Sequence, residues 1–201
     1  METPTDRVRE LVAQIRNLDD ELREALHAQQ SRLQFALDDG RVAFGREVEA
    51  AHRRLRVGLW RFLRRSEPRN VVTAPVVYAM LVPLALLDAA VTIYQALCFP
   101  LYRIPRVPRR RYIVLDRHHL GYLNGIEKLN CAYCGYANGL LAYAREIVAR
   151  TEQFWCPIKH ARHVLGSHAR YAEFLDYGDA EAWEGGLRAQ RSQLRREGEA
   201  G

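Results

Sequence analysis

The residues best suited to chemistry in this chain are three cysteines and one histidine in its C-terminal half. Cys131 and Cys134 form a Cys-x2-Cys pair, and Cys156 and His160 form a Cys-x3-His pair. Thiolate sulfur and imidazole nitrogen are ligands that zinc prefers, and four of them complete a tetrahedral site. The same donors also suit ferrous iron. We therefore expect a zinc or iron centre with Cys131, Cys134, Cys156 and His160 as ligands.

Three further side chains are candidates for additional ligands or for hydrogen-bond partners of the ligands. Glu127 and Glu152 each precede a cysteine by four residues, which is about one helical turn, and His118 opens the same region. Carboxylate ligation would favour iron, and an open coordination position would permit catalysis. For the two glutamates a salt bridge with arginine is an equally good interpretation. For His118 a surface or capping role is the simpler one.

Two other functions fit the same cysteines. Cys131 and Cys134 could cycle between dithiol and disulfide beside a membrane carrier, as in a thiol-disulfide oxidoreductase. The chain has no βαβ pattern, however, and a Cys-x2-Cys pair in mid-helix lacks the activating helix N-terminus. Alternatively the cysteines pack as small apolar residues in a non-enzymatic helical scaffold of a membrane complex. No catalytic residue or substrate follows from the sequence.

The helices predicted around these residues bring the two pairs together. The pattern predicts helices over about residues 120–150, 157–165 and 169–175, and a polar, loosely ordered tail over residues 185–201. Pro157 is favoured at the first position of a helix, so Cys156 is expected at the N-cap. The positive end of that helix would then lower the pKa of the Cys156 thiol.

The longest apolar run, residues 71–102, indicates insertion into a membrane. Its only charged residue is Asp88. The stretch 76–98 alone holds about 23 residues, enough to cross a hydrocarbon core of ~30 Å. Pro83 and Asp88 lie near its middle, where a proline bends a helix and a carboxylate is costly in lipid. A re-entrant hairpin, a kinked single span and two short spans all accommodate these two residues. For Asp88 we favour a structural role, held by the free amides of the bend, over a proton or ion site.

Arginines flank this run on both sides. The chain has 30 Lys and Arg against 24 Asp and Glu, a net charge of +6. Positive flanks normally stay on the cytoplasmic side, so a single span would carry one cluster to the wrong side. We expect anionic lipid headgroups, and no nucleic acid, as the partner of the flanking residues Arg61, Arg64, Arg65, Arg69, Arg103, Arg106, Arg109, Arg110 and Arg111.

The N-terminal third is predicted to be a helical hairpin. Leucines and other apolar residues recur every three or four positions from about residue 5 to residue 38, and Asp38-Asp39-Gly40 reads as a turn. A second helix is expected over residues 42–65, where Trp60 among arginines suits the headgroup region. The first helix would pack on another helix, or join a second copy or another protein as a coiled coil.

The fold class expected is therefore mainly α. Residues 1–70 form amphipathic helices with a basic interfacial end, residues 71–104 a membrane-embedded segment, residues 105–184 a helical Cys/His domain, and residues 185–201 a polar tail. No signal peptide is visible at the N-terminus, and the few cysteines are expected to stay reduced.

Two blocks of the sequence resemble a family of bacterial membrane-associated proteins that has no established activity. The first block is Asn130-Cys-Ala-Tyr-Cys-Gly-Tyr-Ala-Asn-Gly139, and the second is Arg150-Thr-Glu-Gln-Phe-Trp-Cys-Pro-Ile-Lys-His-Ala161. The similarity covers about residues 71–177. The resemblance implies a bacterial inner membrane with the soluble parts mostly cytoplasmic, and it implies no catalytic role.

Overall fold

The computed structural model describes residues 4–32, 35–38, 41–44 and 46–199 of the chain, and it is mainly α-helical, as predicted. The chain divides into two compact units. The first unit is Met1–Ser66 with Asp116–Ala132, and the second is Glu67–Leu115 with Tyr133–Gly201. One long helix, α6, contributes residues to both.

A β-hairpin in the first unit corrects the predicted helical hairpin. Helix α1 (Pro4–Arg32) is followed by strands β1 (Phe35–Asp38) and β2 (Arg41–Phe44), which pair antiparallel. Helices α2 (Arg46–Leu55) and α3 (Leu59–Arg65) complete this part of the chain. Two residues, Asp39 and Gly40, separate the strands, and Asp-Gly at that spacing favours a two-residue hairpin. The predicted turn at these two residues lies outside the described residues.

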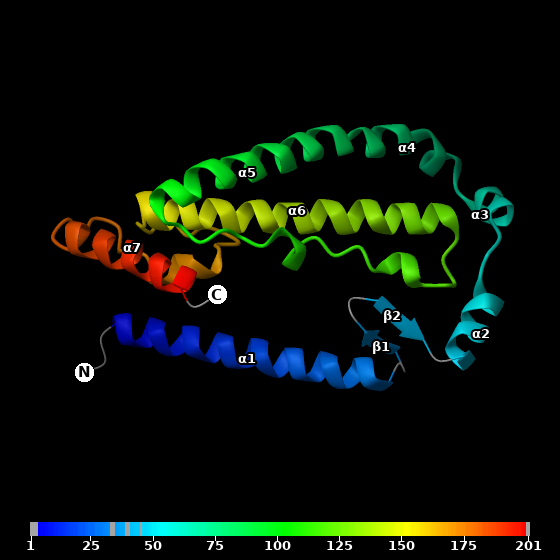
Figure 1. Ribbon diagram of the computed structural model, residues 1–201, viewed down its shortest axis with the longest axis horizontal. Helices are drawn as coiled ribbons and strands as arrows, with labels where there is room; N and C mark the ends of the chain where they lie inside the picture. Colours follow the sequence, from blue (N-terminus) through cyan, green and yellow to red (C-terminus); the bar gives the residue numbers. More distant parts are fainter. Residues whose placement is uncertain (1–3, 33–34, 39–40, 45, 200–201) are drawn as a thin grey trace. The chain divides into compact units, whose positions relative to one another are not determined.

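The apolar run forms a kinked helix in the second unit. Helix α4 (Pro68–Ala79) continues through Met80 into α5 (Leu81–Tyr102) without reversing direction (Figure 1). Pro83 has no amide to donate to the carbonyl of Ala79, which explains the break there. Within the described residues, this 35-residue stretch is the one helix long and apolar enough to cross a membrane, and its most apolar 18 residues have a mean hydropathy of 2.1. A kinked helix, rather than a hairpin or two spans, is therefore the arrangement found.

Helix α6 (Gly125–Trp155) runs alongside α5 in the same direction. Near one end Tyr78 packs on Tyr133, with ring centroids 5.9 Å apart, and at the other Tyr102 packs on Phe154 at 5.3 Å. Parallel neighbours need a connection that runs back along their length. Residues 103–115, here called the return segment, provide the part of it that belongs to the second unit (Figure 1).

The return segment approaches α6 closely at a glycine. A Cβ added to Gly139 would lie 2.5 Å from the Tyr112 carbonyl oxygen and 2.9 Å from the Ile113 Cα. Glycine costs about 1 kcal/mol in a helix interior. Here it allows an extended backbone, rather than a second helix, to lie directly against α6.

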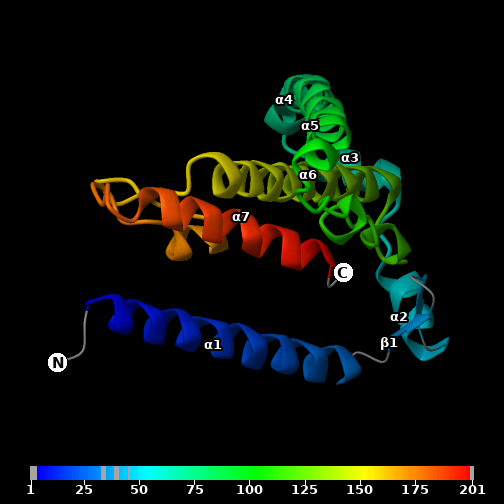
Figure 2. The ribbon, with the colours of Figure 1, turned by 60° about the vertical axis from the view of Figure 1, so that its left-hand side comes forward.

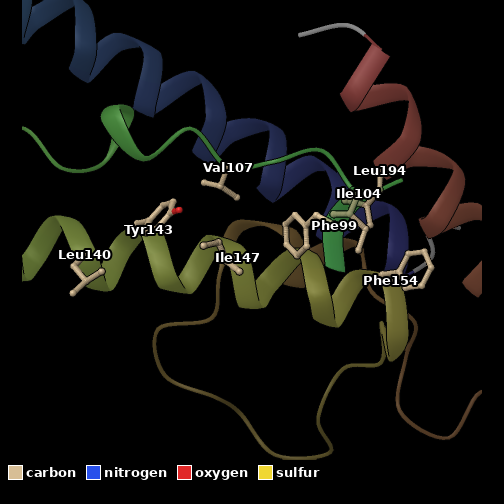
Figure 3. Close-up of a cluster of buried hydrophobic side chains, with 8 residues drawn as sticks. All are labelled: Phe99, Ile104, Val107, Leu140, Tyr143, Ile147, Phe154 and Leu194. Atoms are coloured by element: carbon tan, nitrogen blue, oxygen red, sulfur yellow. The ribbon is translucent and has the colours of Figure 1, made fainter. Parts of the chain in front are cut away.

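The core of the second unit lies where α5, α6, the return segment and the C-terminal helix α7 (Trp183–Glu199) meet, and α6 lies between α5 and α7 (Figure 2). Leu194 of α7 is 1% exposed, so the polar tail predicted for residues 185–201 is wrong: most of it is an ordered helix. Figure 3 shows the buried side chains that form this core: Phe99, Ile104, Val107, Leu140, Tyr143, Ile147, Phe154 and Leu194.

The helix predicted over residues 157–165 is also wrong. The Leu175 amide donates to the Pro157 carbonyl at 2.8 Å, and the Lys159 amide donates to the Leu175 carbonyl at 2.7 Å. These bonds hold the start of the segment extended. A short 3₁₀ helix, Ala169–Glu173, stands where a helix over residues 169–175 was predicted.

Gly139→Ala should destabilise the second unit, because the new methyl group would displace the backbone of the return segment. We expect a loss of about 1–3 kcal/mol in unfolding free energy, measured by thermal or denaturant unfolding in detergent. Gly125→Ala is the matched control, since its Cβ would meet nothing within 4 Å. Equal stability of the two variants would contradict the close approach.

Candidate functional site

The inner face of α5 carries a row of polar side chains in an otherwise apolar helix. Asp88, Thr92 and Gln95 recur at steps of four and three, so they share one face. That face packs on α6 and the return segment through Leu84, Leu87 and other partly buried apolar residues. Polar groups in such a place need partners close by.

Asp88 is held by a fork of hydrogen bonds from Arg109 in the return segment. Arg109 Nε donates to Asp88 Oδ1 at 3.1 Å, and Nη2 donates to Oδ2 at 2.6 Å. The Tyr136 hydroxyl of α6 donates to Oδ2 at 3.0 Å, and Thr92 donates to Oδ1 at 3.4 Å. The hydrogen bond with Asp88 raises the pKa of Arg109, against a smaller opposite effect of burial. Asp88 therefore has a structural role, through these side chains rather than through the free amides of a bend.

Gln95, two helical turns after Asp88, binds the backbone of the same segment. Its Oε1 accepts from the Val107 amide at 3.0 Å, and its Nε2 donates to the Val107 carbonyl at 3.4 Å and to the Tyr143 hydroxyl. Arg106 adds a hydrogen bond of 3.0 Å to the Ala96 carbonyl. The return segment is thus attached to α5 at two places about one and a half to two turns apart.

The structure does not bring the predicted metal ligands together. Cys134 lies in α6 and Cys156 directly follows its last residue, so about 30 Å of continuous helix separates them at 1.5 Å per residue. Cys131 lies three residues before Cys134 on the same helix. Within the described residues, no group of three or more His, Cys, Asp or Glu side chains could hold a metal ion. One zinc or iron ion held by all four ligands of one chain does not fit this arrangement.

Glu127, predicted as an additional ligand, caps helix α6 instead. The Asn124 amide donates to Glu127 Oε2 at 2.8 Å. In return Asn124 Oδ1 accepts from the amides of Ile126 and Glu127, each at 3.0 Å. This reciprocal pair is a capping box with asparagine at the N-cap. The spacing Asn-x-x-Glu was the sequence signal for it.

The other two candidates have different partners. Glu152 forms a hydrogen bond with His168, whose Nε2 lies 2.9 Å from Glu152 Oε2. The His118 ring contacts the His119 ring, with centroids 3.9 Å apart and an angle of 40° between the ring planes. His160 packs its ring on Tyr171, and the two side chains are joined by a 3.1 Å hydrogen bond.

Cys156 has the opposite electrostatic setting from the one predicted. It follows the C-terminal end of α6, where its amide donates to the Glu152 carbonyl at 2.8 Å, and it does not cap a new helix. Burial, followed by the nearby Glu152 carboxylate, raises the pKa of the Cys156 thiol. The four cysteines are free thiols, and Cys134 and Cys156 are exposed. The disulfide-exchange alternative for Cys131 and Cys134 stays a prediction, which thiol trapping in cells tests.

A charged cluster that the sequence analysis missed joins α6 to α7 and to the preceding loop. Glu146 Oε1 accepts from Arg150 Nε at 2.8 Å and from Arg170 Nη2 at 2.9 Å, and Arg170 also reaches Glu197 at 2.8 Å. Burial raises the pKa of Glu146, but the hydrogen bonds and charges of the two arginines outweigh it and lower the pKa overall. Arg170 lies in the 3₁₀ helix Ala169–Glu173, and the helix predicted over residues 169–175 did not indicate its partners on α6 and α7.

Comparisons with protein-family models, with curated proteins and with solved structures found no match to this chain. The resemblance to a bacterial membrane-associated family therefore stays a prediction, and the site rests on its own geometry. That geometry defines a helical unit in which one face of the apolar helix α5 is hydrogen-bonded to the arginine-rich return segment.

Replacing Asp88 by Asn and Arg109 by Gln, singly and together, tests the fork. Arg109→Gln should cost about 1–3 kcal/mol of unfolding free energy, because it leaves the largely enclosed Asp88 carboxylate without its charged partner. Asp88→Asn should cost less, because the unpaired Arg109 is exposed to water. The double variant should cost less than the sum of the single ones. A coupling energy near zero in this double-mutant cycle would show that the pair does not hold the segment.

Alkylation of Cys156 tests its setting. In a variant with Cys98, Cys131 and Cys134 replaced by Ala, the rate of reaction with iodoacetamide should rise with pH around a midpoint above that of N-acetylcysteine, the matched control. A midpoint below that of the control would contradict this setting and favour the predicted N-cap position, because a helix N-terminus stabilises the thiolate.

Proposed function

We propose that this protein is a membrane-attached helical scaffold, with the outer face of α4–α5 as its attachment surface. One observation carries the proposal: no residue in the most apolar part of this helix is fully buried by protein, although its inner face packs on α6 and the return segment. The large apolar side chains left exposed on α4–α5 are Val71, Val72, Val76, Val77, Met80, Val82, Leu86, Ile93, Leu97 and Leu101.

Such a surface is costly in water. Fully burying one Val, Leu or Ile side chain is worth about 1.5–3 kcal/mol, so the exposed row favours an apolar partner strongly. Contiguous apolar patches of this kind mark protein or membrane interaction sites. The length and composition of the helix make a bilayer the better match of the two.

The polar side of the second unit supports a scaffold rather than an enzyme. The enclosed charged groups Asp88, Glu146, Arg150 and Arg170 are engaged in contacts that join helices and loops to one another. Their geometry fixes the fold. The arginine-rich flanks support the cytoplasmic face of a membrane as the location. The resemblance to bacterial proteins implies that this membrane is a bacterial inner membrane. On α1 the exposed Leu11, Ile15, Leu18 and Leu22 offer the surface for a second copy or a protein partner, as the sequence analysis proposed.

A charge on the outer face of α5 should weaken membrane binding. Ile93→Glu should lower the fraction of protein that floats with lipid vesicles roughly tenfold or more, because a carboxylate is costly in hydrocarbon. Val148→Glu on α6 is the matched control, since Ile93 and Val148 are both 59% exposed. Flotation that is unchanged by Ile93→Glu, or lowered equally by both changes, would contradict the proposal.

A further inference from the structure

We infer that α4–α5 lies along the surface of one leaflet, parallel to the membrane plane, on anionic headgroups, and does not cross the bilayer. This inference rests on the proposed membrane attachment and specifies its geometry. The observation behind it is that the arginine-rich return segment lies alongside the apolar helix α5.

The return segment is incompatible with a helix that stands across a bilayer. Arg106 binds the carbonyl of Ala96, and Arg109 binds Asp88, fourteen residues before the end of α5. In a transmembrane orientation these guanidinium groups and their extended backbone would lie deep in the hydrocarbon. Irregular backbone is tolerated at that depth only where protein or a water-filled cavity surrounds it. Arg106 and Arg109 are both exposed, so neither is surrounded here.

Helix α6 leads to the same conclusion. It runs parallel to α5 from the Tyr78–Tyr133 contact to the Tyr102–Phe154 contact, so it would cross the membrane together with α5. Its second half contains the charged residues Arg145, Glu146, Arg150 and Glu152. Four charges within eight residues exclude that half from hydrocarbon.

An in-plane orientation satisfies both faces of α5. The exposed residues Val82, Leu86, Ile93 and Leu97 lie at steps of four and seven, on one side of the helix. The side chains packed on protein, such as Leu84, Leu87 and Val91, lie on the opposite side of the helix. A helix buried on one side by protein and on the other by the headgroup–acyl boundary would sink about 5–10 Å into the leaflet.

In this orientation the arginines at both ends of α4–α5 lie among the headgroups of the same leaflet. Arg69 near the start of α4 and Arg103 directly after α5 are exposed, and Arg64 and Arg65 come just before α4 in the sequence. Lying in the plane, both ends meet the headgroups of one leaflet, so no arginine cluster has to cross. Each arginine near an anionic surface contributes about a fivefold gain in binding.

Membrane depth along α4–α5 tests the inference directly. Spin labels would be placed by Val76→Cys, Leu86→Cys, Ile93→Cys and Leu101→Cys in the full chain with its four native cysteines replaced by Ala. Glu184→Cys serves as the water-exposed reference. In vesicles with anionic lipid, power-saturation EPR should give the same shallow depth at all four outer-face positions. A crossing helix would instead place its middle about 15 Å deeper than its ends, which would overturn the inference, and so would a re-entrant dip.

The sidedness of the two ends provides a second readout. Arg69→Cys and Arg103→Cys, each as a single cysteine in sealed vesicles, should react with a membrane-impermeant maleimide from the same side. Reaction from opposite sides would overturn the in-plane orientation while leaving membrane attachment intact. A protein that fails to float and forms dimers instead would overturn the proposed function as well.

The lipid partner is tested with vesicles of phosphatidylcholine alone and with added phosphatidylglycerol. Binding should rise at least tenfold with the anionic lipid, and Arg69→Gln with Arg103→Gln together should lower that binding by about 25-fold. Equal binding to both vesicle types would overturn the headgroup part of the inference.

Discussion

The contact between Asp88 and Arg109 is the interaction on which the second unit depends. Helices α5 and α6 run in the same direction, so the chain between them must return along their length, and it does so as an extended, arginine-rich segment. An apolar helix offers such a segment nothing to bind. Asp88 supplies the opposite charge, and Gln95 supplies both a donor and an acceptor for the backbone of Val107. Gly139 leaves the space in which this backbone lies against α6. The contacts with the return segment thus explain why an aspartate and a glutamine occur in an apolar helix, and why a glycine occurs inside a long one.

As a consequence, the two faces of α5 lie in two different environments. The inner face of α5 belongs to a protein core around Phe99 and Tyr143, each 0% exposed. Its outer face is apolar and uncovered within the described residues. Glu146 and Arg170 join α6 to α7 through charged groups, whereas the outer face of α5 is apolar, so the unit has a polar side and an apolar side. In this account most of the helix is apolar, apart from Asp88, Thr92 and Gln95 on its inner face, because one face is buried by protein and the other by lipid.

Much of this architecture could be predicted from the sequence. The helical periodicity and the apolar run are local patterns, and they predicted a mainly α-helical fold with one long apolar helix. The site could not be predicted in the same way, because Asp88 and Arg109 are 21 positions apart and no local pattern pairs them. The placement of Cys156 failed for a different reason. Pro157 fits the first position of a helix and also the residues just after one, and α6 extends to Trp155. Glu127 was a candidate for an additional ligand, a hydrogen-bond partner of a ligand or a salt bridge, although Asn124 and its spacing already indicated a helix cap.

The orientation of α5 in the bilayer tests the central claim most directly. Solid-state NMR of the full chain, ¹⁵N-labelled and reconstituted in aligned bilayers that contain anionic lipid, measures the angle between the helix axis and the membrane normal. The account predicts an axis for α5 close to perpendicular to the normal. An axis within about 40° of the normal, the range of helices that cross membranes, would contradict it.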